Sequence, residues 1–219
     1  MIELTKPSSA DDPIKPKLRG WIHATSAVLA IPAVWIMVNA AQPGHLRIGA
    51  LTYGLSLIFL LSTSGSYHTP NWDPRTRAIL RLIDHSMIFV LIGGSYTPFL
   101  LASNGDIFTW FLPVIWVMAL LGILRTLFLP NVNRWVKSGI YVLMGWAAVP
   151  LLGMWITELG NDTVRLLLGG GLIYTVGAVI YAKQWPNPWP KTFGYHEIFH
   201  IAVVLGSVCH YWAVWRVVT

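Results

Sequence analysis

Charged side chains are scarce in this chain of 219 residues, and cysteine is almost absent. Asp, Glu, Lys and Arg together make up 11% of the residues, whereas soluble domains contain about a quarter. The single cysteine, Cys209, excludes an internal disulfide and a thiolate-rich metal cluster. These deficits separate the chain from ordinary soluble enzymes and from disulfide-stabilised domains, and they leave little sequence for a separate soluble domain.

Apolar residues take the place of the missing charges. They make up 55% of the chain, and the mean hydropathy is +0.58. A helix needs about 20 mainly apolar residues to cross a bilayer, and no alternation typical of a β-barrel is visible. Seven apolar stretches are about long enough to cross a bilayer: 21–41, 48–68, 79–102, 107–128, 138–157, 164–181 and 197–217. The sequence therefore predicts an all-α membrane protein, a seven-transmembrane helix bundle.

The first residues do not resemble a cleavable signal peptide. Residues 1–17 are polar and contain three prolines, and they lack an apolar core next to a small-residue cleavage site. We expect residues 1–18 to form an N-terminal tail and residues 19–219 to form one seven-transmembrane domain.

The basic residues predict the orientation of the bundle. In a seven-span topology, the N-terminus and every second loop lie on the same side of the membrane. That side holds Lys6, Lys15, Lys17, Arg19, Arg75, Arg77, Arg81, Arg125, Arg134, Lys137, Lys183 and Lys191, and the other side holds Arg47, Arg165 and Arg216. The positive-inside rule makes the first side cytoplasmic. We therefore expect a cytoplasmic N-terminus, an external C-terminus, membrane lipids as partners and no nucleic acid.

Most ionisable residues inside the spans fall at the predicted cytoplasmic end. Such residues are costly in a membrane, so each one suggests a function. Five of the seven histidines lie at this depth on four different spans, together with Asp84 and Glu197. The histidines are His23, His68, His85, His196 and His200.

The spacing of His196 and His200 favours metal binding. Residues four apart lie on one face of a helix, and two imidazoles at this spacing can bind one metal ion. A third imidazole from His68 would leave a fourth position for water, as in catalytic zinc sites. Imidazole suits zinc. The alternative is that these histidines only lie at the membrane interface, and the spacing alone leaves both interpretations open.

Ser64 and Asp84 are the candidate catalytic residues beside this group. Ser64 precedes His68 by four residues and therefore shares its helix face. Asp84 lies near the same depth, where it could hold a water on the metal and accept its proton. Two simpler roles stay open: Asp84 could pair with Arg81, and Ser64 could bond to a carbonyl of its own helix.

The remaining polar residues at this end have simpler explanations. The string His196-Glu197-Ile198-Phe199-His200 matches the zincin motif H-E-x-x-H, but the expected downstream ligand is missing, because Gly206 occupies its position. We expect Glu197 to point toward the headgroup region. We expect His23 to lie at the membrane interface and His85 to face away from Asp84. His210 lies about 20 Å deeper by helical rise, in the core or in a polar network.

Several motifs together resemble the hemolysin III family, the bacterial branch of the progestin and adipoQ receptor (PAQR) superfamily. They are Ser64-Gly65-Ser66-Tyr67-His68, Asp84-His85 with Gly94-Ser95-Tyr96-Thr97-Pro98-Phe99, and His196-Glu197-Ile198-Phe199-His200 followed by Cys209-His210. The order S-x-x-x-H, Asp, H-x-x-x-H spans nearly the whole chain. The family usually carries a Glu and an Asn upstream of the first-helix histidine, whereas this chain has Arg19 and Pro16 there.

The resemblance implies a zinc ion on His68, His196 and His200, with Asp84 holding a water and Ser64 beside it. It implies a multi-pass protein of the bacterial plasma membrane and a zinc-dependent hydrolase of a lipid amide or ester, such as ceramide, at the cytoplasmic leaflet. The lipid substrate would enter between the helices. The alternatives are a pore-forming or cytolytic protein and a sensor of membrane-lipid state with a structural zinc.

Overall fold

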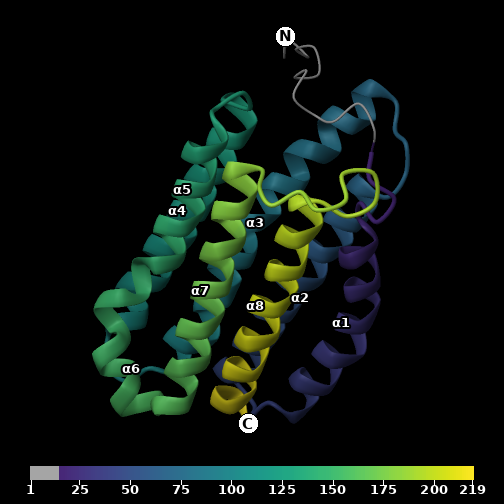
Figure 1. The fold of residues 1–219 in the computed structure, drawn as a ribbon. Helices are drawn as coiled ribbons and strands as arrows, with labels where there is room; N and C mark the ends of the chain where they lie inside the picture. Colours follow the sequence, from purple (N-terminus) through teal and green to yellow (C-terminus); the bar gives the residue numbers. More distant parts are fainter. Residues whose placement is uncertain (1–14) are drawn as a thin grey trace.

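The computed structural model describes residues 15–219, which form helices joined by short loops (Figure 1). Seven helical segments are long and apolar enough to cross a membrane, so the predicted seven-transmembrane, all-α fold is confirmed. The helices are α1 (Trp21–Ala40), α2 (His45–His68), α3 (Pro74–Ala102), α4 (Ile107–Phe128), α5 (Arg134–Gly145), the 3-10 helix η1 (Trp146–Leu151), α6 (Leu152–Leu159), α7 (Asn161–Lys183) and α8 (Tyr195–Val218).

The fifth span is interrupted, although the sequence predicted a single stretch over 138–157. α5 ends at Gly145, the chain tightens into η1, and α6 completes the crossing. Pro150 lies in η1. Proline has no N–H to donate, and its ring clashes with the carbonyl four residues earlier. Pro98 and Pro113 lie inside helices that continue, so proline alone does not determine where a span breaks.

Several helices begin before their apolar stretches, α2 and α3 among them. α2 begins at His45 and α3 at Pro74, whereas the apolar stretches begin at residues 48 and 79. The start of α3 follows from its cap, because Asp73 accepts hydrogen bonds from the backbone N–H groups of Arg75 and Thr76 at 3.0 and 3.1 Å. Proline is well suited to the first helical position. The added turns carry the cationic residues of α3 onto a regular helix.

Helix α8 packs against four other helices. It contacts α1, α2, α3 and α7, and Figure 1 shows it between α7 and α1. We call the end of the bundle where α2 ends and α8 begins the site end. The C-terminus lies at the opposite end (Figure 1). The assignment of the site end to the cytoplasm remains a prediction from the distribution of charge.

Residues 15–20 lie across the site end. Lys15 donates to the carbonyl oxygens of Thr69 and Pro70 at 2.7 and 2.8 Å. The backbone N–H of Lys17 donates to the carbonyl of Lys191 at 3.1 Å. This segment therefore joins the loop after α2 to the loop before α8. The rest of the predicted N-terminal tail, residues 1–14, lies outside the described residues.

Gly65 allows α1 and α2 to approach closely just before the candidate site. A Cβ atom at this position would lie 2.8 Å from the Cα of Ala24 and 2.9 Å from its backbone nitrogen. Backbone atoms cannot move aside as a flexible side chain can. Small residues commonly permit such contacts between membrane helices. Of the glycine run 169–171, Gly170 makes a comparable contact, against His210 and the carbonyl of Gly206.

Replacing Gly65 with alanine should force α1 and α2 apart. Overpacking typically costs about 1–3 kcal/mol, so we expect Gly65→Ala to lower the melting temperature of the detergent-solubilised protein. Gly139→Ala is the matched control, because the space around Gly139 is open and alanine favours helix. An unchanged melting temperature in Gly65→Ala would contradict the close approach of the two backbones.

Candidate metal centre

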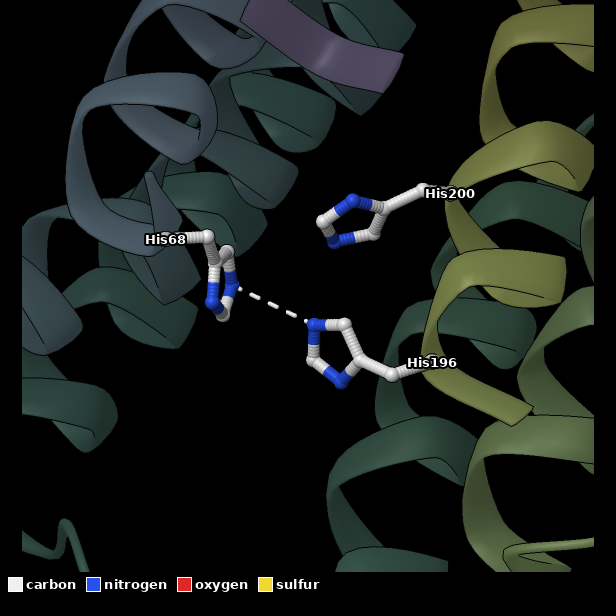
Figure 2. A group of neighbouring side chains, drawn as sticks. All are labelled: His68, His196 and His200. Carbon is white, nitrogen blue, oxygen red and sulfur yellow. Dashed lines mark hydrogen bonds between the residues drawn. The ribbon is translucent and has the colours of Figure 1, made fainter. Parts of the chain in front are cut away.

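Three histidines from two helices meet at the site end. His68 is the last residue of α2, and His196 and His200 lie on the first two turns of α8. One nitrogen from each ring lies within 4.8 Å of the other two, and the Nε2 atoms of His68 and His196 are 3.2 Å apart. Figure 2 shows the three rings pointing toward a common centre. The structure thus brings together all three predicted ligands.

The spacing of these nitrogens fits a tetrahedral metal ion. Imidazole nitrogens lie about 2.0–2.1 Å from zinc, which places two tetrahedral ligands roughly 3.3 Å apart. The observed 3.2 Å between the Nε2 atoms of His68 and His196 agrees with this value. Three imidazoles without a thiolate form a donor set that suits zinc. The residues present therefore fit the group that the sequence predicted.

Asp84 and Ser64 lie beside the three histidines. The Oδ2 atom of Asp84 is 3.7 Å from Nε2 of His68, and Ser64 lies close enough to interact with the Asp84 carboxylate. The Asp84 carboxylate therefore interacts with the histidine cluster rather than with Arg81. Both side chains are largely buried, since Asp84 is 14% exposed and Ser64 is 4% exposed. Helix α3 thus adds a carboxylate to a site built by α2 and α8.

His23 is buried against the site, so its expected position at the interface is wrong. Its ring stacks on that of His200, with centroids 3.8 Å apart and an interplanar angle of 8°. Its Nε2 lies 3.3 Å from the carbonyl oxygen of His200. Because α1 packs on α8 at this depth, the residue is covered by the bundle. The stack restricts the rotation of the His200 ring.

Glu197 is also buried, which corrects its expected location near the headgroups. It is 0% exposed, and it accepts a hydrogen bond from Nε of Arg19 at 2.5 Å and one from the backbone N–H of Gly194 at 2.7 Å. Its partner Arg19 lies 178 residues away in sequence, so helical spacing gave no sign of the pair. The ion pair ties the segment before α1 to the first turn of α8, which carries His196.

One cavity of about 550 Å³ contains the whole group. The three histidines, Asp84 and Ser64 line it, and it continues between helices as far as Trp146 and His210. His85 lines the same cavity, so the expectation that it faces elsewhere is wrong. Its Nδ1 lies 2.6 Å from the carbonyl oxygen of Arg81. His210 packs edge-on against Tyr174 at the deep end.

A family model described as "Haemolysin-III related" matches residues 12–211. The chain belongs to the hemolysin III family. It is 32% identical over 198 residues to Hemolysin-3 of Bacillus cereus, with 88% of this chain and 86% of that protein covered. It is 28% identical over 208 residues to the human Monocyte to macrophage differentiation factor, with 90% and 81% covered.

A relative from the wider superfamily is the Adiponectin receptor protein of Drosophila melanogaster. It is 26% identical over 212 residues, which cover 87% of this chain and 48% of the receptor. The predicted membership of the hemolysin III family within the PAQR superfamily is therefore confirmed. With seven membrane-spanning helices, the family identifies a multi-pass protein of the cell membrane.

Removing the charge of Glu197 should weaken zinc binding, although Glu197 is not one of the candidate ligands. Glu197→Gln leaves the Arg19 charge without its partner, and residues that orient metal ligands typically contribute about 10- to 100-fold in affinity. We expect a lower melting temperature and about tenfold weaker zinc binding, measured by competition with a chelator. The double variant Arg19→Gln/Glu197→Gln should recover part of the melting temperature, because no charge is left unpaired.

Arg216→Gln is the control for this experiment, since Arg216 pairs with Asp162 on the exposed surface at the far end of the bundle. Exposed pairs contribute little, so both quantities should stay near those of the wild type. Zinc affinity and melting temperature that are unchanged in Glu197→Gln would show that the buried pair does not support the site.

Proposed function

We propose that this protein is a membrane zinc hydrolase that cleaves a lipid amide or ester, as a ceramidase does, at the cytoplasmic leaflet. One observation supports it most directly. Three imidazoles, a carboxylate and a hydroxyl line a single cavity, and Ile88, Leu91 and Val203 add apolar surface deeper in it. Hydrolysis needs an activated water and a proton acceptor near the substrate carbonyl, and a lipid substrate needs an apolar place for its chain.

The metal and the residues around it have separate tasks in this proposal. A zinc ion supplies a Lewis acid and lowers the pKa of a bound water to about 7. His68, His196 and His200 would hold the ion, and the stacked ring of His23 keeps His200 oriented. Asp84 lies next to the histidine nitrogens, where it accepts a proton from water and passes it to the leaving amine or alkoxide.

Ser64 and the cavity walls complete the arrangement. Ser64, which lies beside Asp84, helps to keep the carboxylate directed toward the histidines. Ile88, Leu91 and Val203 line the cavity deeper in the bundle, and such walls accept a hydrocarbon chain and keep bulk water out. Excluding water strengthens the electrostatic interactions among the polar groups of the site.

A cytolytic or pore-forming role is the second candidate, suggested by the name of the Bacillus cereus relative, Hemolysin-3. A pore within one chain requires a polar path through the full depth of the bundle. The cavity lining ends near His210, and beyond it Val214 and Val218 on α8 are fully buried against the core. Within residues 15–219, this packing favours a closed cavity over a channel.

A membrane-state sensor with a structural zinc is the third candidate. Structural zinc sites usually have four protein ligands, whereas catalytic sites keep one position open. The candidate group in the described part of the chain contains three. The three-histidine set therefore favours the catalytic interpretation.

Replacing Asp84 with asparagine tests the proposed hydrolysis. The change keeps the size of the side chain but removes the proton acceptor, so we expect turnover of ceramide or of another cleaved lipid to fall about 10²- to 10⁴-fold. Zinc content should remain at the wild-type level. Asp73→Asn is the matched control, because asparagine also caps helices well and Asp73 lies outside the cavity lining. Its turnover should match the wild type.

Two outcomes would contradict the proposal. One is full turnover in Asp84→Asn. The other is a zinc-loaded wild type that cleaves no lipid in a panel of amides and esters with different head groups and chain lengths. Dye release from lipid vesicles, measured on the same preparations, would then identify a lytic activity.

A further inference from the structure

The mouth of the cavity is lined by cationic side chains from two helices. Arg77 and Arg81 come from the first two turns of α3, and Arg134 and Lys137 come from the first turn of α5. Residues three or four apart share one helix face, so both helices present a cationic face to the same space. Arg134 donates to the hydroxyl of Tyr195 at 3.3 Å and remains charged in that contact.

Within residues 15–219, the three carboxylates named next lie at this end, and each has another contact. Asp73 caps α3, Glu197 pairs with Arg19, and Asp84 lies against His68. None of the ion pairs found within residues 15–219 involves Arg77 or Arg81.

A further cation lies behind this mouth. Arg125, at the end of α4, has a buried Nη2 atom without a hydrogen-bond partner. Like Lys137 and Arg81, it is near enough for its charge to act on His85. Among the described residues that line the cavity, the cationic side chains outnumber the carboxylates.

The positive-inside rule explains basic residues at this end but not their placement in the cavity. Arg75, Lys183 and Lys191 meet the same topological preference, yet they are exposed and do not line the cavity. Positive charge that borders a cleft raises the local concentration of anions. The cations that line the cavity can therefore contact an anionic group of a bound ligand, whereas the exposed cations outside it cannot.

One face of α3 orders the parts of the cavity along its length. The lining residues on this helix run from Arg77 and Arg81 through Asp84 to Ile88 and Leu91. At 1.5 Å per residue, the two arginines lie about 4–11 Å outside Asp84. Along α8, the cavity runs from His196 to His210, which is about 21 Å by helical rise. The cationic mouth, the proposed cleavage site and a deeper part with apolar residues such as Ile88 and Leu91 follow one another in this order.

We propose that the substrate is a single-chain amphiphile whose leaving group carries a carboxylate or phosphate within a few bonds of the cleaved amide or ester. Its anionic group lies between α3 and α5, next to Arg77, Arg81, Arg134 and Lys137, and its chain extends inward past Ile88 toward His210. This inference rests on the proposed function for the position of the cleaved bond, whereas the charge preference follows from the cavity itself.

Binding of two uncleavable ligands tests the charge preference apart from hydrolysis. The ligands are the ketone analogues of N-palmitoylglycine and N-palmitoylethanolamine, in which CH2 replaces the amide nitrogen. They share chain length and differ by one negative charge. With the zinc-loaded wild type in neutral detergent at low salt, we expect the anionic analogue to bind about 10- to 100-fold more tightly, as charge-assisted hydrogen bonds allow. The preference should shrink as salt is raised.

Matched variants identify the residues that cause the preference for the anionic analogue. Arg77→Gln/Arg81→Gln should lose most of it, whereas Arg75→Gln/Lys191→Gln should keep it, because the second pair lies outside the cavity lining. Lys137→Gln, from the opposite helix, should reduce it independently and serves if the double variant does not fold. Zinc content and melting temperature confirm that each variant is folded.

Three results would overturn the inference. The wild type could bind both analogues equally, or Arg75→Gln/Lys191→Gln could lose the preference as fully as Arg77→Gln/Arg81→Gln. Inorganic phosphate at millimolar concentration could also remove the preference while N-acetylglycine has no effect, which would indicate a site for free phosphate. A clear preference without cleavage of any lipid amide or ester would refute the hydrolase function and leave the anionic ligand class standing.

Discussion

Imidazole and carboxylate groups are costly to place inside a hydrocarbon layer unless they are paired, and this chain gathers several of them where α2, α3 and α8 meet. His68 contacts His196 and lies near Asp84, and His200 is stacked on His23. The need to satisfy these groups constrains the site end of the bundle. It accounts for the packing of α1 against α8 at the depth of the histidines.

The buried Arg19–Glu197 pair extends this constraint to the segment before α1. Arg19 occupies a position where the family usually carries a different residue, and Glu197 lies between two candidate ligands on α8. The pair joins the segment before α1 to the start of α8. Gly65 lets α1 and α2 approach closely near the same end of the bundle. Residues outside the candidate metal centre thus help to position its three histidines, and the proposed function has the lipid enter between α3 and α5.

The spans and the three candidate ligands were predictable from the sequence, because hydropathy and helical spacing act within about 20 consecutive residues. His196 and His200 share a helix face by spacing alone, and the order of the motifs added His68. The burial of Glu197 and His23 was not predictable, because their partners lie almost the whole chain away. The break after Gly145 was also missed, since proline interrupts one span here while Pro98 does not. Both outcomes depend on tertiary packing, which local patterns do not describe.

The central claim is that the three histidines form a zinc site, and metal analysis of the purified protein tests it most directly. After reconstitution with zinc and removal of excess metal, the wild type should hold one zinc per chain. His196→Ala should hold none, whereas His45→Ala, which changes an exposed residue at the far end of the bundle, should match the wild type. A folded wild type without stoichiometric zinc, or full zinc content in His196→Ala, would contradict the account.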